Sequence, residues 1–307
     1  MNRLFASLAA LGCLGLVTSA SANVIFSDAD GVSSLYTETR FAPTDVYVEY
    51  GFNYGAGGRL TAPIGTPEGG GSETGILVAV NFQDDDGAFD AGINFFPDVP
   101  ASGFYTLEFD VFAGVNSGGG TTEMINAGAH HSGTEVSIDA GDINARDGDW
   151  FEHTTEGGIT NDFITFTANG GTQVAEDFLR NQFGVPNFLE VAMPSPPYPV
   201  VGAPGEVWTR YRVEATPLTT SFYINDVFIA DIIGSDYTSG LPMFGYSDIF
   251  GSVAGGDSPL VVDGVSSFDP FAASFAIFDN ITVTVPEPAS ALLMGLAVLG
   301  VAARRNG

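Results

Sequence analysis

Short runs in which apolar and polar residues alternate follow one another along most of the chain, and glycine, proline, asparagine and aspartate separate them. Alternation with a period of two is typical of a strand that buries one side and exposes the other. The two clearest runs are 104–112 and 208–215, and in the first Tyr105, Leu107 and Phe109 fall on one side. This pattern predicts an all-β protein.

Further strands are expected over 23–26, 46–50, 76–82, 135–138, 163–167, 188–193, 221–224, 227–230 and 275–285. Asn225-Asp226 lies between two of them and is a two-residue hairpin signal. One helix is expected, over 172–183, because Thr172 can cap its first turn and an apolar stripe follows. The proline-rich stretch 194–204 is expected to be a loop.

The first 22 residues have the pattern of a secretory signal peptide. Arg3 supplies a positive start, an apolar run follows, and Ala20-Ser21-Ala22 fits a small-residue cleavage site. Signal peptidase is therefore an expected partner, and Ala20 and Ala22 are the residues that it would recognise. The only cysteine, Cys13, lies in this segment, so the mature exported chain would have no disulfide.

The end of the chain has three features in succession. Pro286-Glu287-Pro288 comes first, the uncharged run 289–303 follows, and Arg304-Arg305 comes last. An apolar helix with a cationic end inserts into a bilayer and keeps that end on the cytoplasmic side. As a helix the run reaches only ~22 Å, less than the ~30 Å of a hydrocarbon core, so we expect a marginal transmembrane helix.

This tail resembles the PEP-CTERM sorting signal of Gram-negative bacteria, on Pro286, Glu287, Pro288, Arg304 and Arg305. The resemblance implies recognition by the membrane enzyme exosortase, transient anchoring in the inner membrane, removal of the tail, and delivery to the cell surface or an exopolysaccharide matrix. An ordinary membrane anchor is the alternative. The expected division is a signal peptide over 1–22, a secreted β-sandwich domain over 23–285 and a sorting tail over 286–307.

Two stretches near the end of the expected domain resemble the concanavalin-like jelly-roll sandwiches of the laminin-G and lectin/glucanase type. The residues concerned are Trp208, Tyr211, Val213, Phe222, Ile224, Asn225, Asp226, Val227, Ile229, Phe278, Asp279, Asn280 and Ile281. The resemblance implies two packed antiparallel sheets. Trp208 is then expected in the core or at its rim rather than on a ligand platform.

Acidic residues dominate the charge of the chain. It has 37 Asp and Glu against 9 Lys and Arg, for a formal net charge of −28. Such a surface repels nucleic acid and anionic lipid, which excludes them as partners. Solubility, for instance in salty surroundings, explains most of these carboxylates, and calcium loading is the alternative for some of them.

Glu108 and Asp110 are the candidate carboxylates of a polysaccharide hydrolase. Retaining glycosidases use two carboxyl groups ~5–5.5 Å apart, and jelly-roll glucanases place them on one strand face. Glu108 and Asp110 share a face of the expected strand, but Phe112 and Gly114 occupy the next positions of that face. The set is incomplete, so we expect these two carboxylates to face solvent or bind a cation.

All three histidines, His130, His131 and His153, lie within 24 residues of one another, near several acids. Imidazole with carboxylate could bind zinc or transfer protons. No metal-binding spacing such as HExxH is present, and the segment has the look of an insertion loop.

Calcium is the expected cofactor, if there is one. Its ligands would come from Asp139, Asp142, Asn144, Asp147 and Asp149, which place five oxygen donors within 11 residues, or from Asp28, Asp30 and Asp279, if the first and last strands are neighbours. The spacing of the first set does not match an EF-hand. Acidic turns without metal are the alternative.

These observations leave three functions open. The leading hypothesis is a non-enzymatic, surface-sorted β-sandwich that binds extracellular carbohydrate through calcium-supported loops. The second is a polysaccharide hydrolase or lyase that uses Glu108 and Asp110 or the histidines. The third is a structural surface protein without a ligand.

Overall fold

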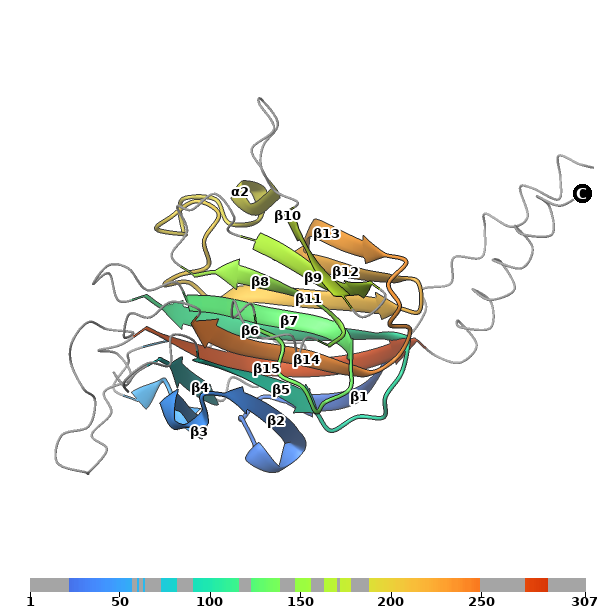
Figure 1. Ribbon diagram of the computed structural model, residues 1–307. Coiled ribbons are helices and arrows are strands. Elements are labelled where there is room, and N and C mark those ends of the chain that lie inside the picture. The colour runs from blue at the N-terminus through green and yellow to red at the C-terminus, as the bar shows by residue number, and fades with distance from the viewer. Residues whose placement is uncertain are drawn as a thin grey trace, which may run out of the picture. The chain divides into compact units, whose positions relative to one another are not determined.

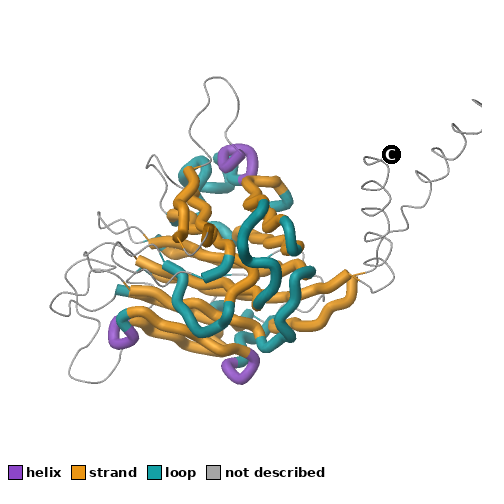
Figure 2. Tube along the Cα trace, turned by 45° about the vertical axis from the view of Figure 1, so that its right-hand side comes forward, coloured by secondary structure: helices purple, strands orange, loops and turns teal. Residues whose placement is uncertain are grey.

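The computed structural model describes residues 22–56, 60, 63, 73–81, 91–115, 123–138, 147–155, 163–169, 172–177, 188–248 and 274–286. Two antiparallel sheets lie face to face as the two layers of a sandwich (Figure 1). The chain crosses repeatedly from one sheet to the other, and strands account for most of the trace in Figure 2. The expectation of an antiparallel jelly-roll sandwich is confirmed.

The first sheet, here called sheet A, has the strand order β13-β12-β11-β6-β15-β4-β3, with β1 also paired to β15. Its strands are β1 (Ala22–Asp28), β3 (Val46–Asn53), β4 (Thr74–Val80), β6 (Tyr105–Gly114), β11 (Thr209–Thr216), β12 (Thr219–Ile224), β13 (Val227–Ile233) and β15 (Phe275–Pro286).

The second sheet, sheet B, has the order β10-β9-β8-β7-β14-β5-β2. Its strands are β2 (Tyr36–Phe41), β5 (Ala91–Pro97), β7 (Glu123–His131), β8 (Asp149–Thr154), β9 (Phe163–Asn169), β10 (Thr172–Asp177) and β14 (Leu241–Asp248). Two short 3-10 helices, η1 (Ser33–Leu35) and η2 (Pro43–Asp45), and one α-helix, α2 (Phe188–Ala192), complete the described elements.

Aromatic rings fill the space between the sheets. Phe95 and Phe244 of sheet B stack with ring centroids 5.1 Å apart, and Phe244 also contacts Phe109 and Phe278 of sheet A at 5.5 and 5.1 Å. The alternation along β6 is therefore the one expected, because Tyr105, Leu107 and Phe109 fall on the side that faces this core and are buried. Residues Ile25–Val283 form one compact unit.

The hairpin expected at Asn225-Asp226 is confirmed. β12 and β13 pair in antiparallel register with Ile224 opposite Val227. Asn225 and Asp226 both have positive φ, 48° and 64°. Positive φ at both central residues is what a two-residue hairpin turn that matches strand twist requires.

Three expectations for local structure are wrong. The segment from Thr172 begins the strand β10 rather than a helix, and its register pairs Thr172 with Asn169. Two residues, Gly170-Gly171, separate β9 from β10, and this hairpin signal outweighs the apolar stripe. The segment 188–193 contains the helix α2 instead of a strand, and 135–138 is irregular. The strand expected over 76–82 ends at Val80. Residues 178–183, the second half of the expected helix, lie outside the described residues.

The tail beyond Pro286 lies outside the described residues, as does the expected signal peptide apart from Ala22. In the part of the chain that is described, no helix is long and apolar enough to cross a membrane.

Candidate functional site

The two candidate carboxylates of β6 lie on the side of sheet A that faces away from the core. Asp110 is buried and accepts hydrogen bonds from Arg210 Nε at 2.9 Å and Nη2 at 2.8 Å. Asn280 Nδ2 donates to the same carboxylate at 2.9 Å. Asp110 is thus held by a bidentate ion pair and an amide, which leaves it poorly placed to act as a nucleophile.

Glu108 belongs to a second charged group next to the first. Its carboxylate lies 4.0 Å from Arg212 Nη1, and burial raises its pKa above the ordinary value. Arg212 also pairs with Glu214 and Asp226 and lies 4.2 Å from the centre of the Tyr223 ring. Both carboxylates therefore lie within networks of charged side chains. Both were expected to face solvent or to bind a cation, and Asp110 does not face solvent, because Arg210 and Asn280 cover it.

The histidines are part of the sandwich, not of an insertion loop. His130 and His131 end β7, His153 lies in β8, and all three are buried. Burial lowers the pKa of His131 and of His153 to about 4, so both rings are neutral at physiological pH. His130 Nδ1 lies 3.5 Å from Asp149 Oδ2.

His153 connects the core to the proline-rich loop. Its Nε2 lies 3.3 Å from the carbonyl oxygen of Gly202, which can only accept, so Nε2 carries the proton. The Tyr211 hydroxyl, 2.7 Å from Nδ1, is then the donor to the other ring nitrogen. These contacts give His153 a structural role.

The carboxylates proposed to bind calcium have protein partners where the structure describes them. Asp28 accepts from the backbone N–H groups of Asp30, Gly31 and Val32 and from the Tyr36 hydroxyl. The Asp279 carboxylate accepts a hydrogen bond from the Tyr54 hydroxyl. The Asp149 carboxylate accepts from the hydroxyls of Thr167 and Thr220, and the Asp147 carboxylate accepts from the Ser132 N–H.

No group of three or more His, Cys, Asp or Glu side chains that could hold a metal ion occurs among the described residues. Asp139, Asp142 and Asn144 lie outside them. β1 and β15 do pair, as the proposed site on Asp28, Asp30 and Asp279 requires.

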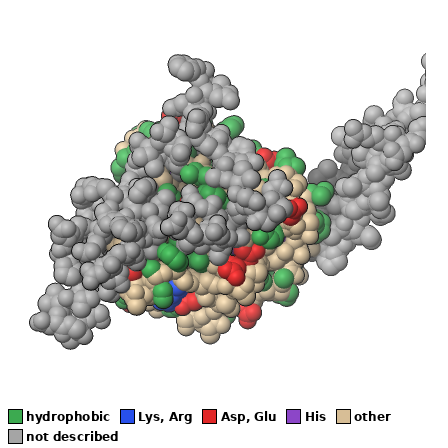
Figure 3. Space-filling view, in the orientation of Figure 1, with side chains coloured by type: hydrophobic (Ala, Val, Ile, Leu, Met, Phe, Trp, Pro, Cys, Tyr) green, Lys and Arg blue, Asp and Glu red, His purple; other side chains and the backbone are tan. Residues whose placement is uncertain are grey.

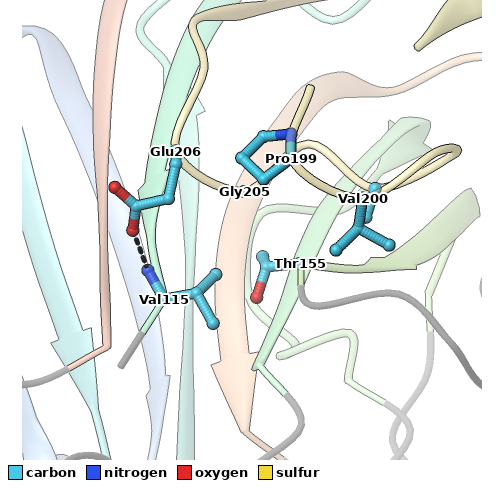
Figure 4. A pocket seen from close by; sticks show the side chains of 7 residues that line it. Val115, Thr155, Pro199, Val200, Gly205 and Glu206 are labelled. Carbon is cyan, nitrogen blue, oxygen red and sulfur yellow. Dashed lines mark hydrogen bonds between the residues drawn. The ribbon is translucent and has the colours of Figure 1, made fainter. Parts of the chain in front are cut away.

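A pocket that was not expected from the sequence opens where the proline-rich loop meets the ends of β6 and β8 (Figure 4). It measures about 190 Å³. Its lining residues are Val115, Thr155, Pro199, Val200, Ala203, Gly205 and Glu206. Thr155, Ala203 and Gly205 are buried and form its floor, whereas Pro199, Val200 and Glu206 are exposed at its rim.

The lining of this mostly apolar pocket includes one charged side chain, that of Glu206. Thr155 is 1% exposed and its hydroxyl oxygen is buried, so this hydroxyl does not open onto the pocket. Glu206 Oε1 accepts from the Val115 N–H at 2.8 Å (Figure 4). Glu206 has a positive φ of 65°, an uncommon conformation for a residue with a side chain. Strained residues of this kind concentrate at functional sites.

The loop that forms one wall of the pocket is held at several points. Backbone N–H groups of Gly205 and Glu206 donate to Thr155 and Ala113 at 3.1 and 2.7 Å. Asn225 Nδ2, from the β12–β13 hairpin, donates to the Ala192 carbonyl at 2.9 Å and to the Tyr198 hydroxyl at 2.7 Å. Asn225 Oδ1 accepts from the Arg210 N–H at 3.1 Å. The wall is therefore formed before any ligand arrives.

Trp208 is half-buried at the rim of an apolar cluster, as expected. Its ring lies 5.2 Å from Tyr54 and 5.7 Å from Phe112.

A polar row on the outer side of sheet B was not expected: Asn126 lies opposite both Glu152 and Gly245, and Gly245 lies opposite Asn94.

Irregular segment 132–138 lies against one end of this polar row. Asn94 Oδ1 accepts a hydrogen bond from the Ser137 N–H at 2.6 Å, and Asn94 Nδ2 donates one to the Ser137 carbonyl oxygen at 3.3 Å. Residues Asn94, Asn126 and Glu152 are all buried, so we assign them to packing.

Comparison with known families identifies the end of the chain. The model described as the PEP-CTERM protein-sorting motif matches residues 284–306. The tail is thus a PEP-CTERM sorting signal, which marks the chain for export, membrane anchoring through the tail and exosortase processing.

Comparison with solved structures gives distant matches. The Emp47p carbohydrate recognition domain is 11% identical with a TM-score of 0.45, and the match covers 87% of this chain and 98% of that one. A galectin-like protein of unknown function from Bacillus subtilis is 9% identical with a TM-score of 0.40, covering 87% and 100%. A glycoside hydrolase family 16 endo-glucanase from Bacteroides ovatus is 8% identical with a TM-score of 0.43, covering 84% and 99%. No curated protein matches the chain in sequence.

Proposed function

We propose that this exported, exosortase-sorted protein is a non-enzymatic carbohydrate-binding β-sandwich of the cell surface or extracellular matrix of a Gram-negative bacterium. The observation that carries the proposal is the pocket of Figure 4, an open hollow with aliphatic walls and one carboxylate, that of Glu206. Small-molecule sites typically combine apolar walls with a few placed polar groups.

The charge of the chain supports a neutral ligand. Acidic side chains are visible over the described part of the face in Figure 3, with little lysine or arginine. A net charge of −28 repels nucleic acid and anionic polysaccharide unless divalent cations bridge the two. Neutral polysaccharide meets no such barrier.

The ion pairs of β6 support binding without cleavage. A retaining glycosidase needs one free carboxylate as nucleophile and a second as acid. Asp110 is instead bound by Arg210 and Asn280, and Glu108 lies beside Arg212.

Binding is tested by exposing the purified full chain to an array of neutral and acidic glycans, with and without EGTA. We expect retention on neutral glycans and none on DNA. Absence of retention on every glycan, in both conditions, would remove the binding part of the proposal and leave a structural surface protein. Turnover of β-glucan or alginate that Glu108→Gln or His130→Ala abolishes would instead establish the hydrolase or lyase.

The sorting signal gives a prediction of its own. Replacing Pro286, Glu287 and Pro288 with alanine should leave the tail attached and the chain in the membrane fraction, because exosortase would lose its recognition peptide. Cell fractionation and the mass of the released protein measure this, with Ser290→Ala as control. Normal release of the triple variant would contradict the role of these three residues.

We also propose that calcium supports the acidic segment 139–149. Calcium that binds only the native state must raise the thermal midpoint. We expect millimolar CaCl₂ to raise the unfolding midpoint of the full chain relative to EGTA, and MgCl₂ at equal ionic strength to raise it less. Equal midpoints in calcium and EGTA would refute the proposal.

A further inference from the structure

We infer that one end of sheet A lies against the surface of the bilayer while the sorting tail is anchored there, and that apolar side chains at this end enter the lipid interface. These side chains are Phe104, Leu218 and Ile233, here called the apolar rim. The inference goes beyond carbohydrate binding and does not depend on it. It follows from the place where the tail leaves the sandwich, from the exposure of the rim and from the length of the tail.

Strand register brings the three rim residues to one end of sheet A. β6 begins at Tyr105, which lies opposite Ala215 near the end of β11. The turn that contains Leu218 joins β11 to β12, and Ile233 at the end of β13 lies opposite the first residue of β12. Phe104 directly precedes β6. The rim is therefore formed by the start of one strand, one turn and the end of another strand.

Backbone hydrogen bonds connect the chain segments that carry the rim. Ser102, in the connection before β6, and Gly240, in the connection after β13, each donate to the carbonyl of the other at 3.0 Å. The Gly234 N–H donates to the Leu218 carbonyl, also at 3.0 Å. The connection 234–240 thus holds both of the other segments, and the rim is one continuous surface.

The sorting tail leaves the sandwich at the same end. β15 is the neighbour of β6, where Asp110 bonds Asn280 and Phe112 stacks on Phe275. Later residues of β6 therefore lie beside earlier residues of β15, and the last residues of β15 lie beside the start of β6. The compact unit ends at Val283. The uncharged run of the tail begins six residues later, which is at most ~20–22 Å of extended chain.

The rim exposes large apolar side chains to water. Leu218 is 71% exposed and Ile233 is 74% exposed, the highest values for a large apolar side chain among the described residues, and Phe104 is 42% exposed. Single exposed apolar residues need no explanation, but a contiguous group marks a surface that contacts a partner or a membrane. The rim is such a group, because the segments that carry it bond one another.

The short tail accounts for a bilayer as the partner. As a helix, the uncharged run 289–303 reaches only ~22 Å, less than the ~30 Å of a hydrocarbon core, so it is a marginal anchor. Attachment by one weak membrane signal becomes stable when a second is added. Because the run begins close to the rim, anchoring holds the rim near lipid at a high effective concentration, and even shallow insertion strengthens the attachment.

Charge selects the kind of lipid. The connections next to the rim carry two exposed acids, Asp98 and Asp236. Like charges repel, so anionic headgroups disfavour this surface, whereas zwitterionic phosphatidylethanolamine and phosphatidylcholine do not. The surface therefore fits a neutral lipid interface.

The first test compares two double variants of the full chain by flotation with phosphatidylethanolamine–phosphatidylcholine vesicles. Leu218→Ser with Ile233→Ser should weaken partition into the vesicle fraction about tenfold or more, because burial of one such side chain is worth roughly that factor. The control is Val191→Ser with Val201→Ser, which should change partition less than about twofold. These two valines are 51% and 48% exposed and lie near the β12–β13 hairpin, at the opposite end of the strands, where Asn225 holds α2 and the proline-rich loop (Figure 1).

The second test measures the contact directly. The only cysteine is Cys13, so Cys13→Ser allows a single spin label at a new cysteine. In the same vesicles, a label at Leu218→Cys or Ile233→Cys should be more accessible to oxygen, which concentrates in lipid, than to a water-soluble nickel complex. A label at Val201→Cys should show the reverse.

Equal partition of the two double variants would overturn the inference, as would rim labels that are no better shielded from nickel than the label at Val201→Cys. Shielding of the rim labels without vesicles, increasing with protein concentration, would show that a second copy of the chain covers the rim instead. Stronger partition into phosphatidylglycerol vesicles would show that the assignment to a neutral lipid interface is wrong. None of these results depends on whether the chain binds a glycan.

Discussion

Replacement of Asp149 by alanine is expected to lower the free energy of unfolding by about 2–5 kcal/mol, because hydrogen bonds to a charged group are worth ~1.5–3 kcal/mol each and this carboxylate accepts two. Asp149 is 1% exposed and lies in β8 of sheet B. Its carboxylate accepts from Thr167 of β9 at 2.7 Å and from Thr220 of β12, in sheet A, at 3.0 Å. It therefore bonds across the two layers, and its loss removes an acceptor from the buried Thr220 hydroxyl and from the half-buried Thr167 hydroxyl.

Urea unfolding of the full chain measures this loss. The control is Glu135→Ala, because Glu135 is an exposed carboxylate without a positive φ, and its loss should change the free energy of unfolding by no more than ~0.5 kcal/mol. A double-mutant cycle of Asp149→Ala with Thr220→Val should give a coupling of about 0.5–3 kcal/mol. If Asp149→Ala unfolds at the same urea concentration as Glu135→Ala, the inter-sheet role of the Asp149 carboxylate is wrong.

Asp279 should make the fold less stable as the pH rises from about 4 to about 7. Its pKa is raised to about 7, chiefly by burial and also by the negative charges of Asp110 and Asp28. Tyr54 and the Asn280 N–H bond the carboxylate and act in the opposite direction. Between ~4 and 7 the native chain binds a proton that the unfolded chain has lost, so the free energy of unfolding falls with pH.

Two histidines change the free energy of unfolding with pH in the opposite direction. The pKa of His131 and of His153 is lowered to about 4, below the ~6.5 of an unfolded chain, so the unfolded state binds more protons and stability rises with pH over that range. The free energy of unfolding of the wild-type chain therefore depends on pH through both the histidines and Asp279. Subtracting the wild-type value from that of Asp279→Asn at each pH isolates the contribution of Asp279.

The free energy of unfolding of Asp279→Asn, relative to that of wild type, should increase from pH 4 to pH 7. The increase should reach up to about 4 kcal/mol at pH 8, since each pKa unit is worth ~1.4 kcal/mol. Urea unfolding at fixed ionic strength, in steps across pH 3–8, gives the curve. Ser221→Ala, a half-buried position in β12 of the same sheet that carries no titratable group, is the control and should give a flat difference. A flat difference for Asp279→Asn as well would mean that its carboxyl titrates at an ordinary pKa in the folded chain.

Sequence reasoning recovered those strands that have a clear period. β6, β11, β12 and β15 each alternate, and the turn at Asn225-Asp226 has the residues that its backbone requires. Strands β5, β7 and β14 were missed because both their faces are buried, so their sequences do not alternate. Thr172–Asp177 was misread because pairing with β9 decides its conformation, and a stripe of apolar residues cannot show that pairing.

The candidate site shows the same limit. The proline-rich loop was recognised from its composition, but Thr155 and Val115 lie far from it in sequence and are brought to it only by the pairing of strands. Conversely, Glu108 and Asp110 were rightly placed on one face of β6, yet only the register with β11 shows that Arg210 and Arg212 lie opposite them. Spacing along one strand cannot predict the charges on its neighbour.

Asn225 imposes a constraint on how such a protein can diversify. It occupies a left-handed position of the β12–β13 turn and, with the same side chain, holds the loop that lines the pocket. Glycine would accept the backbone conformation but has no amide, and glutamine would keep an amide but not the fit. Substitutions that reshape the pocket without releasing the loop are therefore expected at Val200 and Pro199 on the exposed rim, while this asparagine stays the same.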